Sequence, residues 1–305
     1  KNSSKTMKTT AAAFLALLCG LAAGSRIPSR DLDATRPVVD ASQVAAINAD
    51  PASTFRAALD PRFASMSVAE ARRMFGLKML TPEQSRQYAE QYISPFDEQF
   101  EAELAADTVG DSIPETFDAR DKWPGAMPVI ENQERCGSCW AYSATEVLSA
   151  RFAIQSNNAT HVLLAPQDPV SCDSGNMGCQ GGMLPAAWAY MKNTGVVTTA
   201  CMPYTAGNGT VAPCPTSCTV PGVEWKKYHA KSAYAVGGFF PWSRVKKIQM
   251  EIMAHGPVQT GYKVYQNFMS YSSGVYNKIE GDLLGGHAVM IFGWGTENGT
   301  PYWLV

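Results

Sequence analysis

The stretch Gln133-Glu134-Arg135-Cys136-Gly137-Ser138-Cys139-Trp140-Ala141 carries the pattern that decides the fold of this chain. It predicts an amphipathic helix that starts near Cys139, with an apolar face at helical spacing: Trp140, Ala144, Val147 and Leu148. Ser138 can cap that helix, so the positive end of the helix dipole is expected beside Cys139. Such a position lowers the pKa of a thiol and favours the reactive thiolate. Cys139 is therefore a candidate nucleophile.

A nucleophilic cysteine needs a base, and the chain contains four histidines. His161 and His229 lie in polar stretches and are expected to be solvated, and His255 ends a predicted helix. His287 follows two glycines and opens an apolar run, which predicts a ring at the tip of a buried strand. A lone histidine on such a strand is more often structural, but the presence of Cys139 favours a role as its base.

The composition is that of an ordinary globular protein, with 305 residues, 46% hydrophobic and 10% aromatic side chains. This length allows one large domain or two modest ones. The formal net charge of -2 gives no indication of a nucleic-acid or membrane-surface partner, and no apolar run is long enough to span a membrane. We therefore expect no nucleic-acid partner and no membrane partner.

The first residues are typical of a secretory signal. Lys8 precedes an apolar run from Ala11 to Ala23, and the small residues at its end suit signal-peptidase cleavage. The alternative interpretation is a buried helix of the mature domain. We expect residues 1–24 to be a signal peptide with a few upstream residues, Met7 being the start. The chain then enters the secretory pathway and is lysosomal, vacuolar or extracellular.

The cysteine count agrees with an oxidising compartment, because eight cysteines are present. Cys19 would leave with the signal peptide, and Cys139 must stay a free thiol to act as a nucleophile. Six cysteines then remain for three disulfides: Cys136, Cys172, Cys179, Cys201, Cys214 and Cys218. Sequence alone allows fifteen pairings of six cysteines. A zinc site is the poorer alternative, because paired C-x2-C knuckles are lacking apart from the one that contains Cys139.

The composition changes along the chain. Residues 25–112 are rich in Ala, Asp, Glu and Arg without cysteine, and 66–75 predict a short amphipathic helix. Residues 96–111 are acidic and predict a loose connector. From Ile113 the chain is rich in Trp, Gly, Cys and Tyr, which indicates a compact domain, helical at first and with strands after Trp225. The predicted strands are Lys231–Val236, Gly256–Tyr262, His287–Phe292 and Tyr302–Val305.

Ordered motifs along the chain resemble the papain family of cysteine proteases, and its cathepsin B-like members in particular. The resemblance extends from about Val44 to Val305. It rests on these segments: Ile113–Arg120, Gln133–Ala141, Gly178–Gly182, Gly256–Val258, Ser273–Tyr276, Gly285–Ala288, Gly293–Gly295 and Glu297–Val305. It implies an α+β, papain-like two-domain fold. A helical left domain at about 113–222 and a β-barrel right domain at about 223–305 would enclose the active-site cleft.

The resemblance also implies catalytic roles residue by residue. Cys139 would be the nucleophile and His287 the general base and acid, and Gln133 with the backbone N–H of Cys139 would form the oxyanion hole. The pair Gly181-Gly182 would bind the backbone of an extended peptide. The subsite for the second residue before the cut would be lined by Met183, Leu184, Gly261 and Ala288. The resemblance implies peptide and protein substrates, a monomer, no cofactor and no metal.

The disulfide pairing and the role of the N-terminal part follow from the same resemblance. The implied disulfides are Cys136–Cys179, Cys172–Cys214 and Cys201–Cys218. Residues 25–112 would be a propeptide that blocks the cleft of the peptidase domain, 113–305, until acid or proteolysis releases it. Protonation of the acidic connector would weaken that docking. Candidate glycosylation tripeptides of a secreted chain begin at Asn158, Asn208 and Asn298.

Two departures from the cathepsin B-like pattern change the expected activity. Only Thr205–Pro213 separates Tyr204 from Cys214, without the histidines of an occluding loop, so we expect an endopeptidase without dipeptidyl carboxypeptidase activity. The asparagine that orients the histidine in this family would follow Val305, so the peptidase domain is expected to be incomplete at its C-terminus and the 305-residue chain inactive. The alternatives are a catalytically inactive homologue that acts as a binding or decoy protein, and another thiol acyl-transferase. Labelling of Cys139 by an epoxide inhibitor would separate the inactive homologue from both enzymes.

Overall fold

Helix α6 (Cys139–Gln155) is the central element of the helical half of the chain. The computed structural model describes residues 35–93, 113–236, 244–277 and 281–305. All of these residues belong to one unit, 34–305. The predicted signal peptide (1–24) and the acidic connector (96–111) lie outside the described residues. Within the described ranges, no helix has the length and apolarity needed to cross a membrane.

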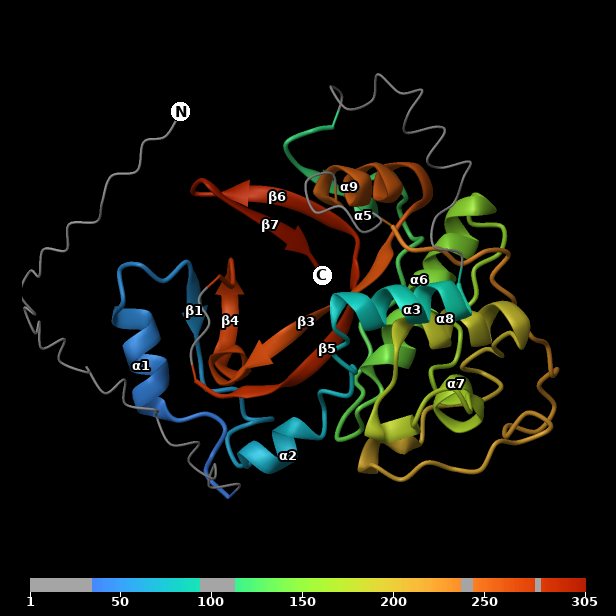
Figure 1. Cartoon of the computed structure of the whole chain (residues 1–305), viewed down its shortest axis with the longest axis horizontal. Helices are drawn as coiled ribbons and strands as arrows, with labels where there is room; N and C mark the ends of the chain where they lie inside the picture. The colour runs from blue at the N-terminus through green and yellow to red at the C-terminus, as the bar shows by residue number, and fades with distance from the viewer. Residues whose placement is uncertain (1–34, 94–112, 237–243, 278–280) are drawn as a thin grey trace, which may run out of the picture. The chain divides into compact units, whose positions relative to one another are not determined.

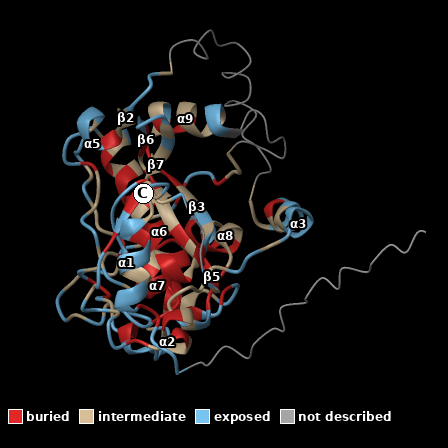
Figure 2. Cartoon of the chain, turned by 90° about the vertical axis from the view of Figure 1, so that its left-hand side faces the viewer, coloured by how far each residue is buried: buried red, intermediate tan, exposed pale blue. Residues whose placement is uncertain are grey.

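Helix α6 is enclosed on nearly all sides. It contacts α7 (Gln167–Cys172) and α8 (Leu184–Asn193) in the helical half, and β3 (Val258–Tyr265) and β5 (Leu283–Ile291) in the other half (Figure 1). The predicted apolar face is buried: Trp140, Ala144, Val147 and Leu148. Hydroxyl side chains elsewhere on the helix are buried as well, because each donates to a carbonyl one turn earlier. The expected amphipathic helix is thus a core helix (Figure 2).

Two short helices and three disulfides complete the helical half. The short helices are η2 (Gly178–Gln180) and η3 (Ala206–Asn208). Helix α5 (Ala119–Lys122) lies against the other half instead, where Ala119 N donates to Phe292 O at 3.0 Å. The disulfides are Cys136–Cys179, Cys172–Cys214 and Cys201–Cys218, which is the pairing that the resemblance implied. Each disulfide restricts the unfolded chain and typically contributes about 2–4 kcal/mol to the free energy of unfolding. Among the described residues, Cys139 is the free cysteine.

The other half contains antiparallel strands covered by one helix. β3 pairs with β5 along its length, with Tyr262 opposite His287. A second sheet has the order β2-β6-β7, whose strands are Phe117–Asp118, Gly293–Glu297 and Thr300–Leu304. After β3, η5 (Gln266–Ser270) leads into β4 (Tyr271–Gly274). Helix α9 (Arg244–His255) shares an apolar core with the strands, formed by Ile252, Val258, Ile291 and Trp294.

Three of the four predicted strands are confirmed, and one is wrong. Lys231–Val236 is irregular, with a single bridge residue at Tyr234. Its alternating side chains pack on α9 and make no sheet, since Val236 joins the apolar core of α9 and Tyr234 Oη donates to Glu251 Oε1 at 2.6 Å. His287 lies in the middle of β5 and not at the predicted strand tip, because the strand already includes the two glycines before it.

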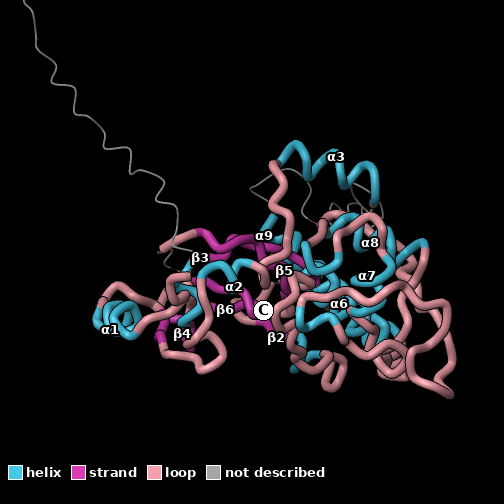
Figure 3. The backbone as a smooth tube through the Cα atoms, turned by 90° about the horizontal axis from the view of Figure 1, so that it is seen from below, coloured by secondary structure: helices cyan, strands magenta, loops and turns pink. Residues whose placement is uncertain are grey.

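The N-terminal segment, residues 35–93, contacts both halves. Its helices and strand are α1 (Ala41–Ala49), β1 (Phe55–Ala57), α2 (Val68–Arg72) and α3 (Pro82–Tyr92). α2 confirms the helix predicted at 66–75 but is shorter, and it begins with a capping box between Ser67 and Glu70. β1 pairs with β4 (Figure 1), and α3 lies against α8 (Figure 3). Between α2 and α3 the segment passes through the boundary between the halves, where Cys139 lies.

Candidate active site

Cys139 begins α6 at the boundary between the two halves, and only 1% of the residue is exposed. Its thiol interacts with backbone groups of Ala288 in β5 and of Gly76 and Leu77 in the N-terminal segment. These hydrogen bonds lower the pKa of the thiol, but burial has the larger effect and raises the pKa of Cys139 above its ordinary value. The predicted lowering of the pKa of Cys139 is therefore wrong for this structure, in which the N-terminal segment contacts the thiol and the thiol is neutral.

Ser138 occupies the N-cap position of α6, but its side chain makes no capping hydrogen bond. Its Oγ lies 2.8 Å from the Tyr204 hydroxyl instead. Ser138 thus occupies the predicted N-cap position but does not cap the helix, because its hydroxyl group is hydrogen-bonded to Tyr204 in a neighbouring loop.

His287 in β5 directly precedes Ala288, which contacts the thiol of Cys139. Its imidazole meets the rings of Phe75 and Tyr262 edge-on, with centroid distances of 5.6 Å and 5.9 Å. Nδ1 is buried without a hydrogen-bond partner. Although part of the residue reaches the surface, burial lowers the pKa of His287 to about 4. The imidazole of His287 and the thiol of Cys139 are therefore both neutral.

Gln133 lies in the loop that leads to α6. Its side-chain Nε2 donates to the carbonyl oxygen of Met74 at 2.6 Å and to that of Cys136 at 2.8 Å. The first bond joins the loop to the N-terminal segment. An amide that already donates to a peptide carbonyl at this place has the chemistry required of an oxyanion-hole donor.

The glycine pair binds extended backbone. Gly182 N donates to Gly76 O at 2.9 Å, and Lys78 N donates to Gly182 O at 2.9 Å. Gly181 has φ +107°, and a Cβ on it would lie 2.1 Å from Gly76 O, so a side chain at this position would exclude the bound segment. On the opposite wall, Leu77 N donates to Gly286 O at 3.0 Å. The segment from Met74 to Lys78 therefore bonds to both walls of a cleft.

The residues predicted for the subsite are distributed over both walls. Gly261 and Ala288 face each other in the β3–β5 register. Leu77 packs on Gly261 so closely that a Cβ on this glycine would lie 2.0 Å from Leu77 Cδ2. Met183 N donates to Asn176 Oδ1 at 2.6 Å directly after the glycine pair, and Leu184 packs against the core of the helical half. Gly261, Ala288 and the side chain of Leu77 are thus brought together.

The other histidines lie away from Cys139. His161 is exposed, with Nε2 2.7 Å from Gly125 O, and His229 is exposed, with Nδ1 3.1 Å from Lys192 O. His255 is the last residue of α9, as predicted. No group of three or more metal-ligating side chains was found among the described residues.

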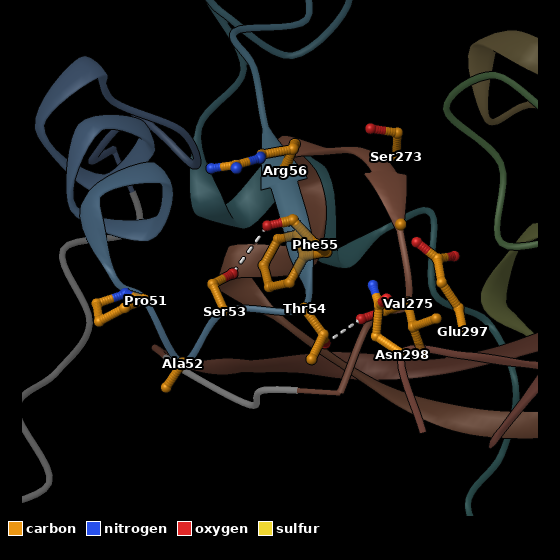
Figure 4. A pocket seen from close by; sticks show the side chains of 11 residues that line it. Pro51, Ala52, Ser53, Thr54, Phe55, Arg56, Ser273, Val275, Glu297 and Asn298 are labelled. Carbon is orange, nitrogen blue, oxygen red and sulfur yellow. Dashed lines mark hydrogen bonds between the residues drawn. The ribbon is translucent and has the colours of Figure 1, made fainter. Parts of the chain in front are cut away.

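A pocket of about 550 Å³ lies apart from this cleft, between the β1–β4 pair and the β6–β7 turn (Figure 4). Its lining includes Arg56 from the N-terminal segment and Glu297 and Asn298 from the turn. It contains neither a cysteine nor a histidine, so it has no nucleophile–base pair.

Sequence reasoning missed two groups of the site. Asn176 holds the glycine pair in place, because its Oδ1 accepts from Met183 N while its Nδ2 donates to Asp173 Oδ2 at 2.7 Å. Tyr204 donates to Gln133 O at 3.1 Å. Tyr204 could not be identified from a local pattern, since only the fold brings it to Gln133, whereas the contacts of Asn176 are with residues three and seven positions away.

Comparisons with known proteins agree with this arrangement. Residues 113–305 match the family model described as papain family cysteine protease. Cathepsin B-like cysteine proteinase 4 of Caenorhabditis elegans is 42% identical over 226 residues, which cover 64% of this chain and 66% of that protein. Cathepsin B-like CP3 of Giardia intestinalis is 38% identical over 194 residues, covering 63% of each protein. The match spans less than two thirds of the length of the first curated relatives, at 66%, 65% and 58%.

A solved structure, that of procathepsin B S9 from Trypanosoma congolense, resembles this chain with a TM-score of 0.73 and 28% sequence identity. The similarity covers 88% of this chain and 87% of the other. It therefore includes part of the N-terminal segment as well as the region matched by the family model.

Proposed function

The chain belongs to the papain family of cysteine proteases and has its α+β fold, and from this premise we propose that it is the zymogen of a cathepsin B-like endopeptidase. One observation carries the proposal. The extended backbone of Met74–Lys78 is bound along both walls of a cleft that contains Cys139 and His287. A groove that pairs with the backbone of one extended peptide is suited to bind peptide substrates in the same manner.

The proposed reaction is peptide hydrolysis through an acyl-enzyme. His287 takes the proton of Cys139, and the thiolate sulfur bonds to the scissile carbonyl carbon. Gln133 Nε2 and the backbone N–H of Cys139 stabilise the oxyanion. His287 then protonates the leaving amine as the C–N bond breaks, and finally activates the water that hydrolyses the thioester.

The N-terminal segment is proposed to act as the inhibitor of its own chain. It covers Cys139 and encloses His287 against Phe75, which keeps both groups neutral. Its departure would expose both side chains to water and let a thiolate–imidazolium pair form. Leu77 occupies the place of a substrate side chain at Gly261, which is why the segment and a substrate compete for one cleft.

The short loop supports endopeptidase specificity. Thr205–Pro213 contains no basic residue, so it offers no positively charged partner for the terminal carboxylate of a substrate. Its first part is held close to the body of the helical half, because Thr205 N and Ala206 N both donate to Gln167 Oε1, at 2.8 Å and 3.1 Å. Three disulfides fit a secretory compartment, and we propose lysosomal or extracellular activity on peptides and proteins as a monomer.

The test of this function is the choice between two substrates. The full-length zymogen, matured at acid pH, is expected to cleave a peptide blocked at both ends and to release no dipeptide from a free C-terminus. A Cys139→Ala variant provides the blank. Dipeptide release would contradict the endopeptidase proposal, and failure to cleave either peptide, with no labelling of Cys139 by an epoxide, would favour an inactive homologue.

A second prediction concerns the subsite at Gly261. Because Leu77 fills the space beside this glycine, we expect a preference for leucine as the second residue before the cut. Gly261→Val should lower kcat/KM for a leucine substrate roughly tenfold or more, since overpacking costs about 1–3 kcal/mol. An alanine substrate, whose side chain is too short to reach the added methyls, is the control. Equal losses for both substrates would show that Gly261 does not line this subsite.

A further inference from the structure

The hydroxyl group of Tyr204 connects the two sides of the candidate oxyanion hole. It donates to the backbone oxygen of Gln133 at 3.1 Å and lies 2.8 Å from Ser138 Oγ, which can donate to it in turn. Gln133 carries the amide that would stabilise the oxyanion, and Ser138 precedes the nucleophile whose N–H would do the same. One hydroxyl thus joins the backbone segments of both donors.

The ring of Tyr204 is itself held in place. It packs edge-on against Tyr142, with centroids 4.9 Å apart, and the loop that follows it is bonded to Gln167 in α7. Arg135 N also donates to Gly207 O at 2.9 Å. Burial raises the pKa of Tyr204 to about 12, so the hydroxyl keeps its proton across the working pH range. The loop therefore presents a fixed donor to the segment that carries Gln133.

That segment needs external support because its backbone is strained. Glu134, the residue after Gln133, has φ +53°, in the left-handed region that costs a residue with a side chain about 1–2 kcal/mol. Such a conformation persists where surrounding contacts enforce it. Here Asn132 Oδ1 accepts from Glu134 N at 2.9 Å, and the side chain of Glu134 lies against Gly207.

We infer that Tyr204 is a positioning residue for the reaction, which fixes Gln133 Nε2 in the orientation that binds the oxyanion. The inference rests on the proposed function. It gives the loop after Tyr204 a role in this chain, which is to support the segment that carries Gln133. Tyr204 does not touch substrate and acts through Gln133.

The test is a double-mutant cycle in the matured full-length protein. Tyr204→Phe keeps the ring and removes the hydroxyl, and it is expected to lower kcat roughly tenfold with KM unchanged, as for the loss of one hydrogen bond. In a Gln133→Ala background the same change should lower kcat less than twofold, because the group that it orients is gone.

A merely structural role would give another pattern. Tyr190→Phe, which removes a buried hydroxyl that donates to Asp168 at 2.7 Å, is the matched control and should lower the melting temperature without changing kcat. Equal losses of kcat from Tyr204→Phe in both backgrounds, or a loss of melting temperature alone, would overturn the inference. If Gln133→Ala itself left kcat unchanged, the proposed function would fail first, and the inference with it.

Discussion

Glu146→Gln is expected to stabilise the folded chain by about 2–3 kcal/mol at pH 7 and by almost nothing at pH 4. Glu146 lies on α6, and burial, reinforced by the charge of Glu131, raises its pKa to about 7. Burial raises the pKa of Glu131 as well, and its Oε2 is enclosed without a hydrogen-bond partner. Burial therefore disfavours the charge of both carboxyl groups, and the charge of Glu131 further disfavours that of Glu146.

The sign of the effect follows from proton linkage. Between pH 4.5, the ordinary pKa of a glutamate, and about 7, the unfolded carboxyl of Glu146 has lost its proton while the folded one retains it. The unfolded state then binds fewer protons, so the free energy of unfolding falls as the pH rises through this window. This difference in pKa between the folded and the unfolded state lowers the free energy of unfolding by about 3 kcal/mol at pH 7 and above. Glu146 by itself therefore makes the folded chain less stable as the pH rises through this window.

The measurement is urea unfolding between pH 4 and pH 7, on the Cys139→Ala background to prevent self-cleavage. Relative to the parent, Glu146→Gln should raise the free energy of unfolding by about 2–3 kcal/mol at pH 7 and by almost nothing at pH 4. Glu90→Gln, at an exposed position of α3, is the control and should leave the pH dependence of the parent unchanged. An equal gain for Glu146→Gln at pH 4 and pH 7 would contradict a titration and would indicate better packing instead.

The candidate residues of the site could be selected from the sequence because their local patterns are strong. Cys139 begins a helix with a recognisable apolar face, and His287 was selected from only four histidines. The six remaining cysteines form the three disulfides that the resemblance implied. Local spacing identifies Cys139 and His287 because each lies in one continuous motif, whereas the disulfide pairing came from the family resemblance and not from spacing.

The protonation of the site was not predictable in the same way. The helix dipole beside Cys139 predicts a lowered thiol pKa, but the N-terminal segment buries the thiol and reverses the shift. Lys231–Val236 alternates like a strand, yet its side chains face α9, as Tyr234 shows. Tyr204 meets Gln133 across 71 positions of sequence, and spacing contains no information about such a contact. Local sequence patterns therefore leave out two effects, which are burial by distant parts of the chain and contacts between residues that are far apart in sequence.

Arg151→Met is expected to lower the free energy of unfolding by about 3–5 kcal/mol, which is the usual cost of removing one partner of a buried ion pair. Arg151 on α6 bonds to Glu251 Oε1 on α9 at 2.7 Å, and Glu251 is fully buried. Its guanidinium also donates to the carbonyl oxygen of Pro257 at 2.9 Å, just before β3. The pair thus joins the central helix of one half to the helix and strand of the other.

The decrease in the free energy of unfolding should come mainly from the buried carboxylate of Glu251, which is left without its cation. The lost attraction between Arg151 and Glu251 should contribute less. Without Arg151, the Tyr234 hydroxyl at 2.6 Å still donates to Glu251, whose second oxygen is buried without a hydrogen-bond partner. Arg151→Met combined with Glu251→Met removes both charges, and is expected to recover at least half of the loss because apolar groups of similar volume can replace a buried pair. Urea unfolding at pH 5 measures both variants. A cost below 1 kcal/mol for the single change would show that this ion pair contributes little to holding the two halves together.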